Sequence, residues 1–298
     1  MQINMVTESR PAGHKNQKKN TVAALLFLLP AALSLGIFVF YPFFRSIYLS
    51  FFLTNKLGTP AKFMGFKNFT RVWPKLKVSI GDTVHYALVL SVVTFVLSMI
   101  LAYMCVNQKK GSRGYQTMFS LPLAIATAPM AAIATYIFGK YGMLNGLLGT
   151  SINWFGDPKY KFICLIILVA WCNCGASFIY LLVGFRNVPD ELVESAELDG
   201  AGSIRKLFSI YIPIASPQIF YVVFLNILTA FKSFTMIKML FSSKTDKGLQ
   251  VLNWMVYRQA FEESRFESAC IYALALCALI FLVTRIQMFL EKRIVHYQ

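Results

Sequence analysis

Charged residues are scarce in this 298-residue chain. Only 14% of its residues are Asp, Glu, Lys or Arg, whereas 57% are hydrophobic. A typical soluble domain carries about 25% charged residues, so the composition argues against a water-soluble protein. Six spans of about 20 residues, with short connections, would use up this length. We therefore predict an all-α integral membrane protein with about six transmembrane helices.

The sequence also lacks the residue patterns that catalysis needs. It has no G-x-x-x-x-G-K-[ST] phosphate-binding loop, so we do not expect the chain to hydrolyse ATP itself. Its three histidines, His14, His85 and His296, are isolated from one another. No nucleophile–base pair is evident. We predict no catalytic residue, no metal site and no cofactor.

Cysteine is used sparingly and without a ligand-like spacing. Cys172 and Cys174 are two positions apart, which points them to different sides of a helix and suits neither a metal nor a disulfide. We expect all six cysteines to be small buried residues of apolar stretches: Cys105, Cys164, Cys172, Cys174, Cys270 and Cys277.

Acidic residues are also few, since 13 Asp and Glu stand against 29 Lys and Arg, for a net charge of +16. The basic residues are scattered between apolar runs and form no basic domain, so we do not expect nucleic-acid binding. Lys and Arg at the ends of spans, near anionic membrane lipid, explain the excess.

The apolar runs define the organisation of the chain. Residues 1–20 are polar and are predicted to form a cytoplasmic tail, and the run from Thr21 to Phe44 is predicted to be an uncleaved first span. Residues 45–79 mix Phe and Trp with charges, which is typical of an interfacial element on the bilayer. The transmembrane domain, 21–298, has further predicted spans at 82–106, 116–138, 161–184, 214–236 and 267–289.

Six crossings place both termini, the link 107–113 and the polar stretch 185–212 on one side. Lys109, Lys110 and Arg113 fit the positive-inside rule there, whereas the outer segment 45–79 holds seven basic residues and does not. Charge alone therefore leaves the orientation open.

The stretch 185–212 predicts two short helices joined by a glycine. Pro189 suits a first helical turn, and Asp190 and Glu191 favour its positive end. Gly200 is able to take the left-handed conformation that ends a helix. A second amphipathic helix is expected from Ser203, and Pro213 is expected to open the next span.

This stretch resembles the cytoplasmic coupling loop of ABC importer permeases, which has the pattern E-A-A, three residues, G, nine residues, I-x-L-P. Here Glu194-Ser195-Ala196, Gly200 and Ile210-Tyr211-Ile212-Pro213 keep every spacing. Two positions depart from the pattern, Ser195 for Ala and Ile212 for Leu.

Further segments resemble the carbohydrate-uptake branch of that family. These are Gly65-Phe66-Lys67-Asn68-Phe69 after the first span, Arg113-Gly114-Tyr115 before the third span and Leu198-Asp199-Gly200-Ala201-Gly202 in the loop. The short basic C-terminus is similar to that of the glycerol-3-phosphate permease A component.

The resemblance implies a type I-like permease that forms one half of a heterodimeric pore with a second permease subunit. It also implies two ATPase subunits beneath 189–212, an extracellular solute-binding protein and alternating access in a bacterial inner or cell membrane. The solute would be an oligosaccharide, a sugar alcohol or glycerol-3-phosphate. Glu194 would anchor the loop or cap its own helix. The expected ATPase-coupling residues are Glu194, Ser195, Ala196, Asp199, Gly200 and Ala201.

Polar residues inside two spans indicate a candidate solute path. Asn226, Thr229 and Ser233 recur at i, i+3 and i+7 in the fifth predicted span, and Asn173 and Ser177 share a face of the fourth. In related permeases these two spans border the translocation cavity. Packing between helices explains the same residues, and Ser177 is also able to bond to its own helix.

Lys232 and Lys238 lie near the outer end of the fifth predicted span. They either attract an anionic solute or extend to lipid phosphates. An ion-coupled secondary carrier and a membrane-bound lipid enzyme are the competing functions. Neither an internal repeat nor acidic residues at span centres, which carriers often show, are evident.

Overall fold

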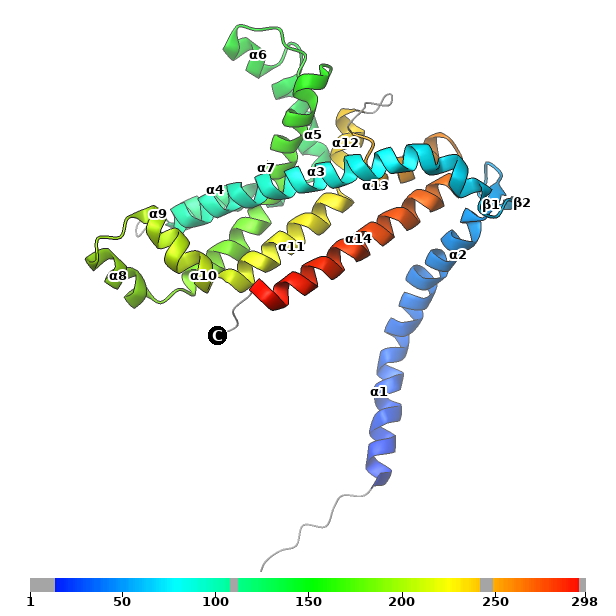
Figure 1. The fold of residues 1–298 in the computed structure, drawn as a ribbon, viewed down its shortest axis with the longest axis horizontal. Helices are drawn as coiled ribbons and strands as arrows, with labels where there is room; N and C mark the ends of the chain where they lie inside the picture. The colour runs from blue at the N-terminus through cyan, green and yellow to red at the C-terminus, as the bar shows by residue number, and fades with distance from the viewer. Residues whose placement is uncertain (1–13, 108–111, 242–248, 295–298) are drawn as a thin grey trace, which may run out of the picture.

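The computed structural model describes residues 14–107, 112–241 and 249–294. Within these ranges the chain is almost entirely helical, with one two-stranded antiparallel sheet (Figure 1). Four helices are long and apolar enough to cross a membrane, and two bent helix pairs raise the number of candidate spans to six. The predicted all-α membrane fold is confirmed. The tail residues 1–13 and the link lysines Lys109 and Lys110 lie outside the described residues.

The first part of the first candidate span stands apart from the other helices, whereas its C-terminal part packs against the last long helix (Figure 1). The span consists of α1 (His14–Leu35), a π-helical segment (Gly36–Phe40) and α2 (Tyr41–Ser50). The helix is longer than the predicted span at both ends and overlaps the predicted tail 1–20. In its most apolar part no residue is buried within the chain, so these side chains are left for lipid or another protein to cover.

The predicted interfacial segment 45–79 is not one separate element. It contains the end of α2, the hairpin of β1 (Phe52–Thr54) and β2 (Pro60–Phe63), and the start of α3 (Lys67–Val106). The second span was expected to begin at residue 82, but α3 runs without interruption from Lys67. Its first turns are amphipathic, because Asn68, Val72, Leu76 and Ser79 lie buried on one face while the basic residues are exposed.

The Gly65–Phe69 segment ties the hairpin to α3. Gly65 takes a left-handed conformation with φ of +56°, which glycine adopts without a steric penalty. The Asn68 amide then donates hydrogen bonds to the carbonyl oxygens of Ser50 and Phe52, at 3.1 and 2.9 Å. One side chain therefore joins the end of the first span to the start of the second.

The third predicted span, 116–138, is broken rather than continuous. The chain forms α4 (Ser112–Ser120), a 3₁₀ turn (Leu121–Ala124), α5 (Thr127–Phe138) and α6 (Met143–Leu148), with a bend of 100° between the two halves. Pro122 lies in the 3₁₀ turn and the next residues, Ile125 and Ala126, are extended. A proline supplies no amide hydrogen for a helix, which favours the break at this point.

The fourth and sixth spans match the expectation closely, as α7 (Pro158–Arg186) and α14 (Phe266–Ile294). Helices α3 and α7 pack along each other. Ser91, Thr94 and Ser98 are buried on α3, and the Ser98 hydroxyl lies 3.2 Å from the Cys174 carbonyl oxygen on α7. Small and hydroxyl side chains let membrane helices approach closely in this way.

The fifth predicted span, 214–236, is also interrupted. Helix α11 (Ser216–Lys232) follows α9 (Ser203–Lys206), a π-helical segment (Leu207–Tyr211) and α10 (Ile212–Ile214), with a bend of 83°; α12 (Thr235–Leu240) comes after it. The Asn253 amide donates to the Lys232 carbonyl oxygen at 2.7 Å. It thereby satisfies a carbonyl left free at the helix end. Ser233 is consequently outside the helix on which it was predicted.

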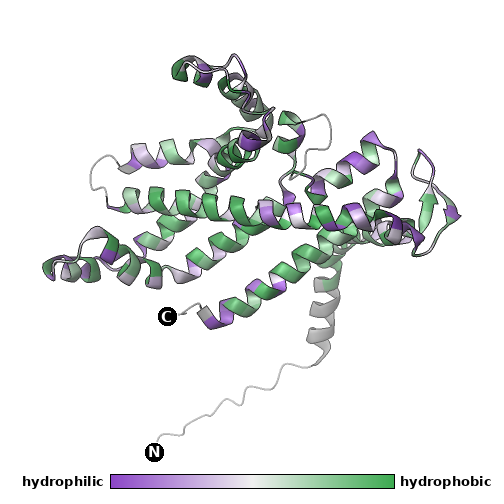
Figure 2. Ribbon diagram, turned by 45° about the horizontal axis from the view of Figure 1, so that its top comes forward, coloured by the Kyte–Doolittle hydropathy of each residue, from purple (hydrophilic) through white to green (hydrophobic). Residues whose placement is uncertain are grey.

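The remaining elements complete the packing. A segment made of α13 (Leu252–Tyr257) and a π-helical turn (Arg258–Glu262) leads into α14. Apolar residues cover the long helices, and hydrophilic ones gather at the helix ends and the hairpin (Figure 2). The expectation that all six cysteines are buried is wrong for Cys277, which is exposed on α14, and for Cys172 and Cys270, which are partly exposed. These cysteines lie on long apolar helices, where we expect membrane lipid or another subunit to cover the side chains that the chain itself leaves exposed.

Candidate functional site

The stretch 185–212 forms the two short helices that the sequence predicts. Helix α8 (Asp190–Leu198) begins directly after Pro189, whose backbone is extended. Asp190 and Glu191 lie in its first turn, where negative charge stabilises the helix N-terminus. No residue of α8 is buried, so the helix projects from the bundle (Figure 1).

Gly200 makes the sharp turn between α8 and α9. Its φ is +74°, a region that side chains with a Cβ rarely adopt. The Gly200 amide donates to the Glu197 carbonyl oxygen, and the Ala201 amide donates to that of Ala196 at 2.9 Å. These bonds satisfy carbonyls at the end of α8. The predicted left-handed glycine is confirmed.

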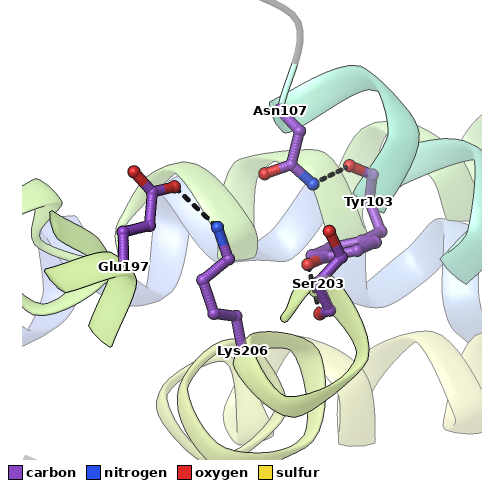
Figure 3. A network of polar contacts seen from close by, with 5 residues as sticks. All are labelled: Tyr103, Asn107, Glu197, Ser203 and Lys206. Carbon is purple, nitrogen blue, oxygen red and sulfur yellow. Dashed lines mark hydrogen bonds and ion pairs between the residues drawn. The ribbon is translucent and has the colours of Figure 1, made fainter. Parts of the chain in front are cut away.

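Two side-chain contacts hold this turn in a fixed geometry (Figure 3). The Lys206 amine lies 2.6 Å from a carboxylate oxygen of Glu197, which connects α9 to α8. The Tyr103 hydroxyl donates to the Ser203 carbonyl oxygen at 2.5 Å, which connects α9 to the end of α3. The Asn107 amide donates in turn to the Tyr103 carbonyl oxygen. The two short helices are therefore tied to each other and to a long span.

Packing beneath the turn adds to this anchoring. Val188 and Tyr211 are buried in one cluster with the ends of α3 and α7. The ring of Tyr211 makes edge contacts with Tyr103 and Phe185, with centroid separations of 5.4 and 5.5 Å. On the outer surface two apolar side chains stand among exposed polar ones, since Leu198 is 90% exposed and Ile204 is 76% exposed. Such side chains on an anchored projection suit contact with another protein.

The predicted coupling residues all lie on or beside this turn. Glu194, Ser195, Asp199 and Gly200 are exposed, and Ala196 and Ala201 are partly buried. Among the described residues Glu194 has no hydrogen bond or ion pair, and α8 has no side-chain cap, so capping by Glu194 is not observed. Tyr103, Glu197 and Lys206 are not among the residues that the sequence predicts for this turn. Tyr103 is 100 residues from Ser203, and no local pattern connects them.

Three of the five predicted solute-path residues line one cavity of about 190 Å³ between α5, α7, α11 and α12. Asn173 comes from α7, Thr229 from α11 and Ser233 from the break after α11, where Lys232 joins them. The Tyr86 hydroxyl donates to Ser233 at 3.3 Å. Small-molecule sites occupy about 300–1,000 Å³. In this conformation the cavity is smaller than that range.

The other two predicted path residues lie elsewhere. Ser177 and Asn226 are buried, and the Ser177 hydroxyl donates to Asn226 Oδ1 at 2.7 Å. They join α7 to α11 and are not among the residues that line the cavity. Lys238 differs from Lys232, because its amine donates to the Tyr257 hydroxyl at 2.5 Å. Of these two lysines, Lys232 is the one that lines the cavity.

Known proteins resemble this chain in sequence over most of its length. Residues 94–296 match the family of binding-protein-dependent transport system inner membrane components. The probable ABC transporter permease protein YurN of Bacillus subtilis is 28% identical, over 89% of this chain and 93% of its own length. The sn-glycerol-3-phosphate transport system permease protein UgpA of Pectobacterium atrosepticum is 26% identical, over 98% of this chain and its whole length.

A solved structure shares the fold. A chain in the crystal structure of a bacterial ABC transporter involved in the import of the acidic polysaccharide alginate superposes with a TM-score of 0.80. It covers 95% of this chain and 99% of its own length at 19% identity. A second crystal structure, of the alginate transporter in complex with an alginate pentasaccharide-bound periplasmic protein, gives a TM-score of 0.81.

Proposed function

Because the chain belongs to the family of binding-protein-dependent transport system inner membrane components, we propose that it is the permease subunit of an ATP-driven importer for a carbohydrate-class solute. The solute crosses the membrane by alternating access, and separate subunits hydrolyse the ATP. The membrane is the inner or cell membrane of a bacterium. The observation that supports this best is the anchored turn of α8 and α9.

The turn has the properties of a mechanical coupling element. A subunit that closes on ATP moves a permease only through a part that does not yield. The ion pair between Lys206 and Glu197 joins α9 to α8, and the bond from Tyr103 to Ser203 joins α9 to α3. Exposed Leu198 and Ile204 offer an apolar contact. A push on α8 is thereby transmitted to α3 and, through Tyr211, to the start of α11.

The proposed partners are two ATPase subunits beneath residues 189–212, a second permease subunit that completes the pore as a heterodimer, and an extracellular solute-binding protein. The related alginate transporter was solved in complex with an alginate pentasaccharide-bound periplasmic protein, which supports the last of these. The exposed first span leaves apolar surface for membrane lipid and for a second permease subunit.

The solute class is proposed from the relatives and from the cavity. UgpA is named for sn-glycerol-3-phosphate and the solved transporter for alginate, so oligosaccharides, sugar alcohols and glycerol-3-phosphate are the candidates. Asn173, Thr229 and Ser233 supply amide and hydroxyl groups that pair with a hydroxyl-rich solute. Ser177 and Asn226 bond to each other between α7 and α11.

Gly200→Ala tests the coupling role against a matched control, Gly202→Ala. A Cβ at either glycine meets no atom within 4 Å, but Gly200 has a φ of +74° whereas Gly202 has −67°. A left-handed alanine costs about 1–2 kcal/mol. We expect Gly200→Ala, and more strongly Gly200→Ala with Glu194→Ala, to lower uptake and solute-stimulated ATP hydrolysis. Solute binding to the external protein stays unchanged, and Gly202→Ala resembles the wild type. Normal uptake in the Gly200/Glu194 double variant would disprove the coupling role.

A labelling experiment tests the orientation separately. A cysteine in place of Leu198, which is 90% exposed, is expected to react with a membrane-impermeant thiol reagent in inside-out vesicles and not on intact cells. The wild-type chain gives the background from its own cysteines. Labelling of Leu198→Cys on intact cells places the loop outside and removes the basis of the proposal.

A further inference from the structure

A second cavity lies between α4 and α7 and has no role in the function proposed above. Its volume is about 450 Å³, which is within the range of small-molecule sites. Arg113, Gln116, Thr117 and Ser120 line it from α4, at helical spacings that share one face. Arg186, the last residue of α7, lines it from the other side. We name it the Arg113–Arg186 cavity.

The charge of this cavity is positive. No Asp or Glu is among the described residues that line it. Neither guanidinium forms an ion pair or a side-chain hydrogen bond with another residue of the part of the chain that the structure describes. Each guanidinium therefore keeps its N–H donors available, in the planar arrangement that matches phosphate and carboxylate oxygens.

The hydroxyl groups of the wall do not compete with the arginines for an anion. Thr117 donates to the Arg113 carbonyl oxygen at 3.0 Å, and Ser120 donates to the Gln116 carbonyl oxygen at 2.7 Å. Their hydrogens are used within α4. The positive donors that face the cavity are thus the two arginines, which come from different helices.

The opposite wall is apolar. It consists of Phe178, Ile179, Leu182 and Val183 of α7. A ligand that fits both walls carries an anionic group at one end and carbon-rich surface beside it. Inorganic anions satisfy only the first requirement, whereas a phosphate ester satisfies both.

We propose that the Arg113–Arg186 cavity binds the phosphate group of a phosphate ester, with its carbon skeleton against α7. The cavity lies at the end of the bundle that carries α8, because Arg186 is followed directly by residues 187–189. Two sources present this chemistry at a membrane surface: the head group of an anionic phospholipid and a soluble phosphate ester. The inference rests on the cavity alone and does not depend on the coupling role of Gly200.

The experiment compares Arg113→Gln/Arg186→Gln with Arg285→Gln in the intact transporter, purified through a tag on this chain with its co-purifying subunits. Arg285 is an exposed arginine of α14 that does not line the cavity. In the lipid arm, native mass spectrometry measures retention of phosphatidylglycerol against phosphatidylcholine. In the soluble arm, glycerol 1-phosphate and inorganic phosphate compete with the retained lipid.

The wild type and Arg285→Gln are expected to retain phosphatidylglycerol, and the double variant to bind it about tenfold or more weakly, because it loses the charge-assisted hydrogen bonds of both guanidinium groups. Displacement by glycerol 1-phosphate assigns the site to soluble esters, and resistance to displacement assigns it to lipid. The proposal is overturned if the wild type and the double variant bind phosphatidylglycerol equally and also bind glycerol 1-phosphate equally. If the double variant does not fold, Arg113→Lys/Arg186→Lys replaces it, because this change keeps the charge and loses the bidentate geometry. The lysine variant is expected to bind phosphatidylglycerol more weakly than the wild type. Unchanged binding by the lysine variant also overturns the proposal.

Discussion

The Ser177 hydroxyl donates a hydrogen bond of 2.7 Å to Asn226 Oδ1 and joins the fourth span to the fifth. Both side chains are buried. The Asn226 amide nitrogen has no partner among the described residues, so this amide depends on a single bond. Two residues chosen from the sequence as contacts for solute therefore contact each other.

Replacing Ser177 by Ala separates packing from solute contact. The change leaves the Asn226 amide buried without a partner, and we expect unfolding to become easier by about 1–3 kcal/mol with little change in the KM for uptake. Thr229→Ala, which alters the cavity wall, is expected to raise KM with a smaller effect on melting temperature. Thermal melting of the purified protein and initial uptake rates measure the two effects. A raised KM without a lower melting temperature in Ser177→Ala would show that the pair touches solute.

Any side chain at Gly184 is predicted to destabilise the protein. A Cβ at this position lies 2.9 Å from Gln218 Cβ and 3.3 Å from Ala215 Cβ, where α7 meets the start of α11. We expect Gly184→Ala to destabilise the protein by about 1–3 kcal/mol through overpacking. Gly81→Ala is the control, because no atom lies within 4 Å of its Cβ, and alanine favours the helix by about 1 kcal/mol. Equal melting temperatures for the two variants would contradict this packing.

Asn68 is predicted to respond more strongly to Asp than to Ala. Alanine removes the amide that donates to the Ser50 and Phe52 carbonyl oxygens, at a cost of about 1–3 kcal/mol. Aspartate removes the same donor and also places a carboxylate against two carbonyl oxygens in a buried position. Asn55→Ala, in the exposed hairpin turn, is the control and is expected to be milder. Thermal melting gives the order, and an Asn68→Asp variant at least as stable as Asn68→Ala would be incompatible with the donor role.

Lys206 and Glu197 are predicted to be energetically coupled. The Lys206 side chain is 10% exposed and the Glu197 side chain 57% exposed, so solvent weakens the pair and we expect a coupling energy of only about 1 kcal/mol. Melting of Lys206→Met, Glu197→Gln and the double variant measures this energy. The coupling is expected to fall as salt is raised. Additive effects of the two changes at low salt would mean that the contact does not hold the turn.

The turn of α8 and α9 was predicted correctly because its geometry depends on neighbouring residues. Pro189 directly precedes α8, and Gly200 takes the left-handed conformation, as these residue types favour locally. The span breaks were harder to predict. Pro122 gave a local signal that the third span bends. At the break at Ser233 the Lys232 carbonyl accepts from the amide of Asn253, which is 21 residues away in the sequence.

Short segments of the sequence were enough to show that this chain lies in a membrane, where its apolar runs cross, and that a glycine turn follows the fourth span, because hydropathy and backbone preference are local properties. Which polar side chains contact one another, by contrast, depends on the folded chain. Folding pairs Ser177 with Asn226, brings Asn173 and Thr229 to one cavity, and ties Ser203 to Tyr103. Helical spacing gives the face on which a side chain lies, but the neighbouring helix decides whether that face meets a cavity or another side chain.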